Sequence, residues 1–243
     1  MILAANWKMY GNQLLLKQWS ESLATQHDHE LILFPPATLF ASAVAFEGYD
    51  LGAQNMHEED QGAYTGELSA TMLLEVKVKW VLLGHSERRL YCAETDEKVA
   101  KKWAKALQSG LKPMVCVGES LADREAGLAI DAVANQIKKC LENLPKQNHP
   151  LIIAYEPLWA IGSGLVPSVA DIDQMHGLIQ SVVADHGHQA KVLYGGSVKP
   201  SNAAKIAAIG SVDGLLIGGA SLKIDDFNEV VRLCTISSCS RTS

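Results

Sequence analysis

Eight short apolar runs recur along the chain, separated by longer segments of mixed polarity. Each run is too short for a typical helix and lacks polar alternation, which predicts strands that are buried on both faces, as in a parallel sheet. The segments between the runs are long enough for crossover helices. The predicted strands are residues Ile2–Ala5, Leu31–Phe34, Tyr49–Ala53, Trp80–Leu83, Pro113–Val117, Leu151–Tyr155, Lys191–Tyr194 and Gly214–Ile217.

Several of the intervening segments carry the signals that begin and end helices. Thr95 stands before two acidic residues, which are favoured in a first turn, and Gly110 ends that segment. Ser168 and Asp171 have the spacing of a capping box, and Gly187 ends the apolar pattern that follows them. Two further amphipathic patterns cover residues 128–144 and 227–233.

Alternating strands and helices leave two architectures open, a doubly wound sheet and a closed barrel. Eight predicted strands in 243 residues favour a single-domain (βα)8 barrel with eight parallel strands, which typically needs about 250 residues. No linker divides the chain, so the barrel is predicted over residues 1–234. The polar, unpatterned residues 235–243 are expected to form a loose tail.

The composition argues against several classes of binding partner. A net charge of -6 argues against a nucleic-acid or membrane-surface binder, although it allows an anionic substrate at a locally positive site. The five cysteines include no CxxC pair and indicate reduced thiols, and His27, His29 and His57 lie on segments that look like surface, so no metal site is expected. Polar residues follow the start too soon for a signal peptide, so we expect a cytoplasmic protein.

Polar residues or glycines follow most of the predicted strands directly. Because parallel strands end at the same rim, these positions should lie together at the carboxyl end of the barrel, where barrel enzymes carry their chemistry. The alternative is that the polar residues only mark the edge of the core. The positions are Asn6, Gln54, His85, Glu119, Glu156, Gly195–Ser197 and Gly218–Gly219.

Two of these rim segments carry groups that suit an anionic carbonyl substrate. Lys8, just past the first strand, would supply positive charge, although a lone lysine is usually a solvated surface residue. If a short helix begins near Ser86, its amino terminus disfavours protonation of His85 and keeps that imidazole neutral. The alternative is a structural histidine in a polar cluster with Glu87 and Arg88.

Glu156 ends an apolar strand and begins a loop that runs from Pro157 to Gly164. A carboxylate in this place could act as a general base, with a pKa raised by burial once the loop closes. The apolar body of the loop, around Trp159, could cover a site between hinges at the proline and the glycines. The alternative is an apolar loop packed permanently against the barrel.

Glycine pairs follow the seventh and eighth strands, at residues 195–196 and 218–219. Glycine lets backbone N–H groups approach a phosphate closely, and barrel enzymes often bind phosphate at these two turns. Their occurrence after both of the last two strands favours a phosphate site more than a single pair would. The sequence contains no GxxxxGK[ST], GxGxxG or HExxH motif that would indicate another chemistry.

Taken together, the motifs resemble those of the triosephosphate isomerase family, in order over nearly the whole chain. The resemblance implies a TIM barrel that interconverts dihydroxyacetone phosphate and D-glyceraldehyde 3-phosphate through an enediolate, in glycolysis and gluconeogenesis, without a cofactor. The matching stretches are residues 5–9, 52–55, 62–67, 84–89, 116–119, 154–157, 194–198 and 214–222.

The resemblance also implies the division of roles known for this family. Glu156 would be the base that moves the proton, and His85 the neutral electrophile that polarises the carbonyl. Lys8 would be a further catalytic residue. The implied substrate-binding residues are Asn6, Lys8, Gly162, Ser197, Gly218 and Gly219, and the supporting residues are Ser86, Glu87 and Cys116.

Members of the family are typically homodimers, which implies that a loop over residues 54–69, with Gln54 at its start and Thr65 at its tip, inserts into a second copy beside Asn6 and Lys8. Triose phosphates would be the small-molecule partners, with no nucleic acid or membrane. Positions that depart from the family pattern put dimer strength and the kinetics of the lid in doubt, but not the chemistry. These positions are Tyr10, Leu158, Ser163 and Leu165.

Two other functions stay open at this point. Another phosphate-binding barrel enzyme, such as one acting on indole or ribulose phosphates, would need a different base and no apolar lid after the sixth strand. A non-catalytic sugar-phosphate binder on the same scaffold is disfavoured because the three principal chemical residues are present. An isomerase assay without metal or cofactor separates these possibilities.

Overall fold

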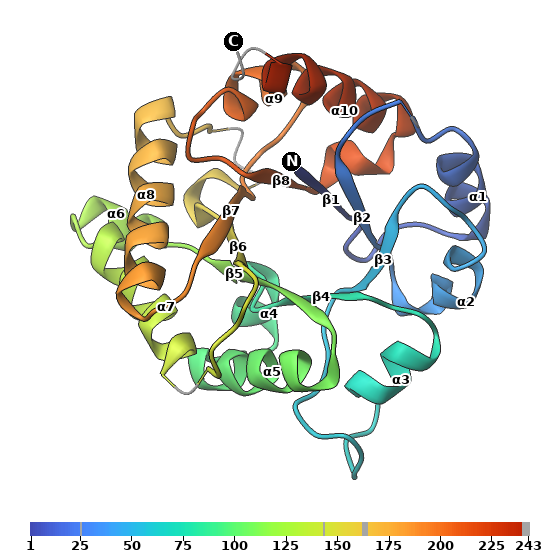
Figure 1. Ribbon diagram of the computed structural model, residues 1–243, viewed down its shortest axis with the longest axis horizontal. Coiled ribbons are helices and arrows are strands. Elements are labelled where there is room, and N and C mark those ends of the chain that lie inside the picture. The colour runs from blue at the N-terminus through green and yellow to red at the C-terminus, as the bar shows by residue number, and fades with distance from the viewer. Residues whose placement is uncertain (25, 143, 162–164, 240–243) are drawn as a thin grey trace.

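The computed structural model describes residues 1–24, 26–142, 144–161 and 165–239, and its eight strands close into one barrel (Figure 1). All neighbouring strands are parallel and follow the order of the chain, which confirms the predicted (βα)8 architecture. The strands are β1 (Ile2–Asn6), β2 (Glu30–Phe34), β3 (Asp50–Ala53), β4 (Trp80–Leu83), β5 (Lys112–Val117), β6 (Leu151–Tyr155), β7 (Ala190–Tyr194) and β8 (Gly214–Ile217).

The strands lack alternation because each has apolar neighbours on both faces. In β1, Ile2 and Ala4 belong to the core inside the barrel, whereas Leu3 and Ala5 pack outward beneath the helices. Both faces therefore select apolar residues, which is the pattern of a strand buried on each side. The observed strand boundaries agree with the predicted ones to within one residue at each end.

The helices surround the barrel and cover its outer face (Figure 1). Thr95 caps α5 through its side chain, Gly110 ends that helix in the left-handed region with φ 86°, and Ser168 and Asp171 form the predicted capping box of α8. The α-helices are α1 (Gln13–Glu21), α2 (Phe40–Ala43), α3 (Ala70–Glu75), α4 (Ser86–Tyr91), α5 (Asp96–Ser109), α6 (Leu121–Glu125), α7 (Ala129–Leu141), α8 (Val169–Asp185), α9 (Pro200–Ala207) and α10 (Ile224–Cys239), with 3-10 turns η1 (Ala37–Leu39), η2 (Leu158–Ala160) and η3 (Gly219–Leu222). No helix in the described ranges is long and apolar enough to cross a membrane.

The carboxyl-terminal helix differs from the sequence-based expectation. Residues 235–239, predicted to belong to a loose tail, continue α10, and residues 240–243 lie outside the described part of the chain. Polar composition alone did not predict this helical segment. In the structure, Thr235 makes two specific contacts. Its hydroxyl donates to the carbonyl of Val231 at 3.0 Å and lies 3.0 Å from Nε2 of His29.

Two histidines are held neutral by burial within the fold. His29, expected on the surface, is half-buried between Thr235 and the amino group of Met1, and burial lowers its pKa to about 4. His176 is fully buried on α8, where its Nδ1 lies 3.1 Å from the carbonyl oxygen of Ser211. Burial lowers the pKa of His176 to about 4 as well.

We expect the free energy of unfolding to decrease as the pH falls from about 6.5 to 4. Both histidines bind a proton more readily in the unfolded chain than in the fold, so acid favours unfolding in this window. For the buried His176 the slope is about 1.4 kcal/mol per pH unit. Urea denaturation at several pH values measures the free energy of unfolding. Its dependence on pH in this window should be weaker for His176→Asn than for the original chain. Equal slopes would contradict the assignment of His176.

Candidate active site

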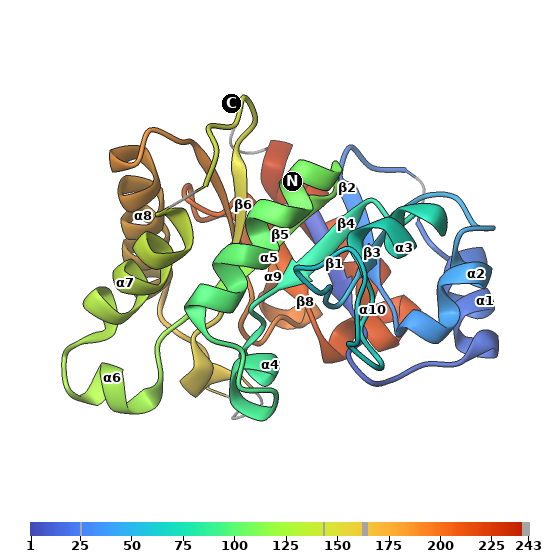
Figure 2. The ribbon, with the colours of Figure 1, turned by 90° about the horizontal axis from the view of Figure 1, so that it is seen from below.

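The strand ends and the turns after them meet at one end of the barrel. Figure 2 shows α4 and the segment after β6 on the same side of the molecule, at the carboxyl ends of the strands. A cavity of about 1120 Å³ opens at this end. The predicted site residues that line it are Asn6, Lys8, His85, Ser86, Glu87, Glu156, Ser197, Gly218 and Gly219.

Lys8 is fixed by its backbone as well as by its side chain. Its φ of 52° places a non-glycine residue in the left-handed region, a costly conformation that is typical of functional sites. Its N–H donates to Oδ1 of the buried Asn6 at 3.0 Å, and its carbonyl accepts from Gln54 at 2.8 Å. Its ammonium group lies 2.7 Å from Oε1 of Glu87. The cation is therefore aimed at the cavity by contacts from three segments of the chain.

His85 and Glu156 meet at the floor of the cavity, although they come from different strands. His85 follows β4 and Glu156 follows β6, and Nε2 of the imidazole lies 3.0 Å from the carboxylate oxygen Oε1. Both residues are buried, with 5% and 2% of their surfaces exposed. The other carboxylate oxygen accepts the N–H of Ser86 at 3.0 Å.

The first turn of α4 sets the tautomer of His85. The helix begins at Ser86, as predicted, and the N–H of Glu87 donates to Nδ1 of His85 at 3.2 Å. A neutral imidazole that accepts at Nδ1 carries its proton on Nε2, facing Glu156. This arrangement leaves an N–H directed at the cavity floor.

The two groups perturb each other's pKa. Burial lowers the pKa of His85, but the carboxylate of Glu156 outweighs it, so the pKa of the histidine is raised in this arrangement. Burial raises the pKa of Glu156, but the contacts with His85 and with the N–H of Ser86 outweigh it, so the pKa of the carboxyl is lowered. The rise in pKa predicted for Glu156 refers to the closed loop and stays a prediction. The lowered pKa predicted for His85 is wrong for this arrangement, because the carboxylate of Glu156 lies 3.0 Å from its Nε2.

The space around Glu156 is closely packed. The buried thiol of Cys116 lies beside it, and burial together with the carboxylate raises the pKa of this thiol, which stays protonated. At Gly118 an added Cβ would lie 1.7 Å from the carbonyl oxygen of Glu156, so only glycine fits. At Gly195 it would lie 3.0 Å from Cγ of the Glu156 side chain. The position of Glu156 therefore depends on two glycines, one against its backbone carbonyl and one against its side chain.

Gly195→Ala should reduce kcat by about tenfold or more, because misplacement of a catalytic group by a fraction of an ångström to 1 Å is costly. The new methyl group would press on the side chain of Glu156 and move its carboxylate. A matched control is Gly177→Ala, since an added Cβ there would meet no atom within 4 Å. Steady-state kinetics of both variants test this, and an unchanged kcat for Gly195→Ala would show that the carboxylate is not displaced.

The glycine turns lie across the cavity from α4. Gly218 precedes η3, and its carbonyl accepts the N–H of Ser221 at 2.8 Å. The carbonyl of Ser221 in turn accepts from the indoles of Trp7 at 3.2 Å and Trp19 at 2.9 Å. The two buried indole rings thus hold the turn in place through the carbonyl of Ser221. An added Cβ at Gly218 would lie 3.5 Å from Cε of Lys8, which places the lysine against this turn.

The segment after Glu156 is anchored by a buried carboxylate that the sequence showed only as a rim position. Glu119 accepts from the hydroxyl of Tyr155 at 3.0 Å, the indole of Trp159 at 2.7 Å and the guanidinium of Arg124 at 3.2 Å. Arg124 also lies 4.4 Å from the Trp159 ring and pairs with Asp171 at 2.5 Å. The start of the predicted lid is thereby fastened to β5, α6 and α8.

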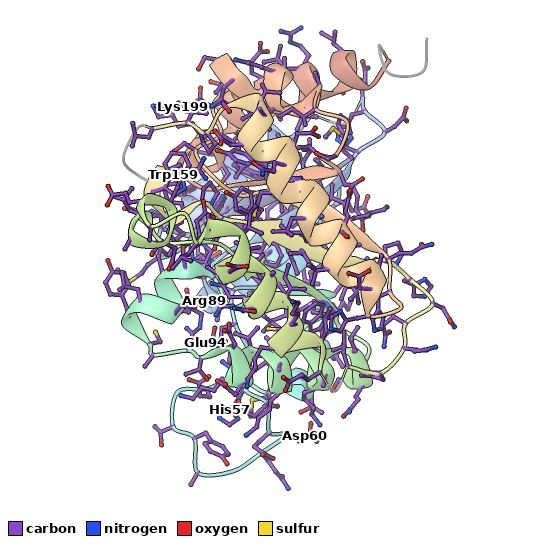
Figure 3. All side chains as sticks on the ribbon, turned by 90° about the vertical axis from the view of Figure 1, so that its left-hand side faces the viewer. His57, Asp60, Arg89, Glu94, Trp159 and Lys199 are labelled. Atoms are coloured by element: carbon purple, nitrogen blue, oxygen red, sulfur yellow. The ribbon has the colours of Figure 1, made fainter. Side chains whose placement is uncertain are left out.

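A second buried carboxylate was missed by sequence reasoning. Glu94 pairs with Lys102 and with Arg88, and its Oε2 accepts the N–H of Gly84 at 3.1 Å (Figure 3 labels Glu94). Lys102 also donates to Oδ1 of Asn55 at 2.9 Å. The pair therefore connects the loop after β3 to the residue before His85. Its only sequence signal is an acid and a lysine eight positions apart, which is not specific.

The remaining predicted positions are placed as follows. Gly162 lies outside the described residues. The side chain of Ser197 donates to the carbonyl of Ala160 at 2.9 Å, which connects the β7 turn to the lid segment. Gln54, at the start of the predicted dimer loop, donates to the carbonyls of Phe34 at 2.9 Å and Lys8 at 2.8 Å. Thr65 is exposed in a loop that projects beyond the helices (Figure 1). No group of three potential metal ligands occurs among the described residues.

Comparison with known proteins gives a consistent result. A sequence profile of the family described as Triosephosphate isomerase matches residues 1–234. The triosephosphate isomerase of Herpetosiphon aurantiacus is 45% identical, covering 95% of this chain and 98% of that protein. Those of Xanthobacter autotrophicus and Alkaliphilus metalliredigens are each 44% identical, covering 96% and 95% of this chain and 96% and 98% of the relatives. The chain belongs to the triosephosphate isomerase family.

Proposed function

We propose that this chain interconverts dihydroxyacetone phosphate and D-glyceraldehyde 3-phosphate by proton transfer through an enediolate. The observation that carries the proposal is the 3.0 Å contact between His85 and Glu156 at the floor of a cavity that also holds Lys8 and two glycine turns. A base, a hydrogen-bond donor and an anion site therefore converge on one small volume. The family's role assigns the reaction to glycolysis and gluconeogenesis, and we propose that it takes place in the cytoplasm.

The proton transfer needs two groups on opposite sides of the substrate. Glu156 removes a proton from C1 of dihydroxyacetone phosphate, and the electron pair moves to the carbonyl oxygen on C2, which accepts a hydrogen bond from Nε2–H of His85. His85 gives its Nε2 proton to the oxygen on C2 and takes up the hydroxyl proton of C1, while the carboxyl group of Glu156 returns its proton to C2 and C1 becomes the aldehyde. The protons on carbon thus pass through Glu156 and those on oxygen through His85, and both residues end in their starting protonation states.

Substrate binding would also change the pKa values of His85 and Glu156 in the direction that the proton transfer requires. A substrate between the two groups would separate the carboxylate from the imidazole and remove the contact that raises the pKa of His85. The N–H of Glu87 on Nδ1 then favours the neutral form, which can donate at Nε2. Loss of the imidazole contact also raises the pKa of Glu156 toward that of a better base.

The phosphate would be bound by backbone N–H groups at Gly162, Ser197, Gly218 and Gly219. The turn that contains Gly218 and Gly219 is held by the indoles of Trp7 and Trp19, so its backbone is rigid before a ligand arrives. Asn6 would hydrogen-bond the substrate and Lys8 would supply a positive charge beside it, with Glu87 holding the lysine in place. Residues 157–164 would close as a lid that excludes water and protects the enediolate.

A coupled assay tests the proposal directly. Purified chain with a metal chelator and no added cofactor should convert glyceraldehyde 3-phosphate to dihydroxyacetone phosphate. Absence of turnover while the ligand still binds would favour a sugar-phosphate binder. Turnover of a different barrel substrate alone would favour another phosphate-dependent enzyme.

We also propose that the active form is a homodimer. Large apolar side chains are exposed near the site and on the projecting loop, among them Met9 at 93%, Tyr10 at 61% and Tyr64 at 46%. Apolar surface gathered in this way is typical of an interface. The loop that carries Thr65 would contact Asn6 and Lys8 of a second copy and complete the floor of its site.

Thr65→Arg should reduce activity more at low protein concentration than at high concentration, because a large cation at the loop tip weakens association. Specific activity over a range of dilutions measures this, alongside sedimentation. Ser181→Arg, on the exposed outer face of α8, is the matched control and should behave like the original chain. A loss of activity that is independent of concentration would contradict completion of the site by a partner.

A further inference from the structure

The active-site cavity extends beyond the groups that the proposed reaction uses. Its wall continues past Ser197 and Gly219 to the first residues of α9 and α10, where it includes Lys199, Lys223 and Asp226. A triose phosphate has about ten non-hydrogen atoms, whereas pockets of about 300–1,000 Å³ hold drug-sized ligands. The cavity of about 1120 Å³ therefore has an outer region that the substrate does not occupy when it reaches Glu156.

The two lysines of this outer region differ from the other cations of the cavity. Lys8 and Arg89 are each paired with a carboxylate, at 2.7 and 2.5 Å. Within the part of the chain that the structure describes, neither Lys199 nor Lys223 forms an ion pair, and both are exposed. Their charges are therefore free to act on an approaching anion.

Both lysines follow the turns that are predicted to bind the phosphate. Lys199 lies in the turn after β7 and Lys223 in the turn after β8, and both line the same cavity as the predicted phosphate-binding glycines. Figure 3 shows Lys199 at the same edge of the molecule as Trp159, which belongs to the predicted lid. Asp226 lines the same wall and offsets part of the charge, which leaves one net positive charge among the three groups.

A local positive field matters because the protein as a whole repels its substrate. The chain carries a net charge of -6, and a triose phosphate is close to a dianion at neutral pH. Charges at the mouth of a cleft act on a ligand before contact and raise the rate of encounter. The pairing of Lys8 with Glu87 at 2.7 Å reduces the field that Lys8 contributes at the mouth, although its charge still acts on a substrate in contact.

We propose that Lys199 and Lys223 form an outer capture position that attracts the phosphate dianion and passes it inward to the glycine turns. This inference rests on the proposed isomerase function. Both are positioning residues, since they touch no reacting atom. They act on the step before the lid closes, so they should affect kcat/KM and leave kcat unchanged.

The double variant Lys199→Met/Lys223→Met tests the proposal through the salt dependence of catalysis. For charges about 10 Å apart, the expected loss in kcat/KM is about five- to tenfold at an ionic strength of about 0.01 M, and about twofold at about 0.15 M. kcat and the thermal midpoint should stay at the values of the original chain. The double arginine variant, which keeps both charges, should restore kcat/KM and its salt dependence.

Lys191→Met/Lys205→Met is the matched control. It changes the net charge by the same amount, but Lys191 lies at the start of β7, at the opposite end of the barrel, and Lys205 is an exposed residue late in α9. The kcat/KM of this control variant should fall much less than that of Lys199→Met/Lys223→Met. The charge reversal Lys199→Glu/Lys223→Glu changes the local charge twice as much as the methionine substitutions do. Its fold-loss in kcat/KM should therefore be roughly the square of theirs.

Two results would overturn the inference. One is a kcat/KM with an unchanged salt dependence in the Lys199→Met/Lys223→Met variant, and the other is an equal loss in the control pair. Failure of the proposed function is distinguishable, because the original chain would then show no isomerisation at any ionic strength.

Discussion

Glu156→Gln should lower kcat by about two to four orders of magnitude, the range that a positioned base contributes. The amide has the shape of the carboxylate, and its oxygen can still accept the N–H of Ser86 or of His85. It cannot take a proton from carbon. The loss should therefore appear in turnover while the fold is kept.

Steady-state kinetics and thermal unfolding measure these two effects separately. Glu125→Gln is the matched control, because it makes the same chemical change on an exposed residue of α6. It should leave both quantities unchanged. A Glu156→Gln variant that kept near-normal turnover would remove Glu156 from the role of base.

Lys102→Met should reduce the free energy of unfolding by about 3–5 kcal/mol, the usual cost of leaving a buried charge without its partner. Glu94 is 2% exposed at its side chain, and Lys102 is its closest cation. Domains are stable by only about 5–15 kcal/mol, so this is a large fraction of the total. Because Glu94 also binds the N–H of Gly84, the residue before His85, activity should fall as well.

Denaturant unfolding measures the change, and Lys101→Met is its control. Lys101 is the neighbouring residue on α5, but it is exposed, and surface substitutions usually change stability by less than about 0.5 kcal/mol. Adding Glu94→Gln to Lys102→Met should recover part of the loss, since the uncompensated charge is removed. Equal effects of the two lysine substitutions would contradict a buried ion pair.

The barrel itself could be predicted because its strands are buried on both faces. Apolar runs such as Ile2–Ala5 and Trp80–Leu83 predict buried strands, and eight of them in a chain of this length favoured a barrel over a doubly wound sheet. The same regularity placed His85 and Glu156 at one rim. The sequence could not predict the 3.0 Å contact between His85 and Glu156, because that distance depends on the register of β4 and β6 around the closed barrel.

What sequence reasoning missed depends on contacts between distant residues. The pKa of Glu156 is lowered because Ser86 and His85 contact it, and no local pattern shows that these contacts outweigh burial. Thr235 lies in a helix, where its hydroxyl bonds to the carbonyl of Val231 and contacts His29. Polar composition alone suggested a loose tail for such a segment.

A crystal structure with dihydroxyacetone phosphate bound would test the central claim most directly. We expect C1 of the substrate to lie about 3–3.5 Å from the carboxylate of Glu156, the carbonyl oxygen to accept a hydrogen bond from Nε2 of His85, and the phosphate to rest on the turn at Gly218 and Gly219. A substrate bound with its phosphate elsewhere, or with Glu156 and His85 unable to reach the same molecule, would contradict it.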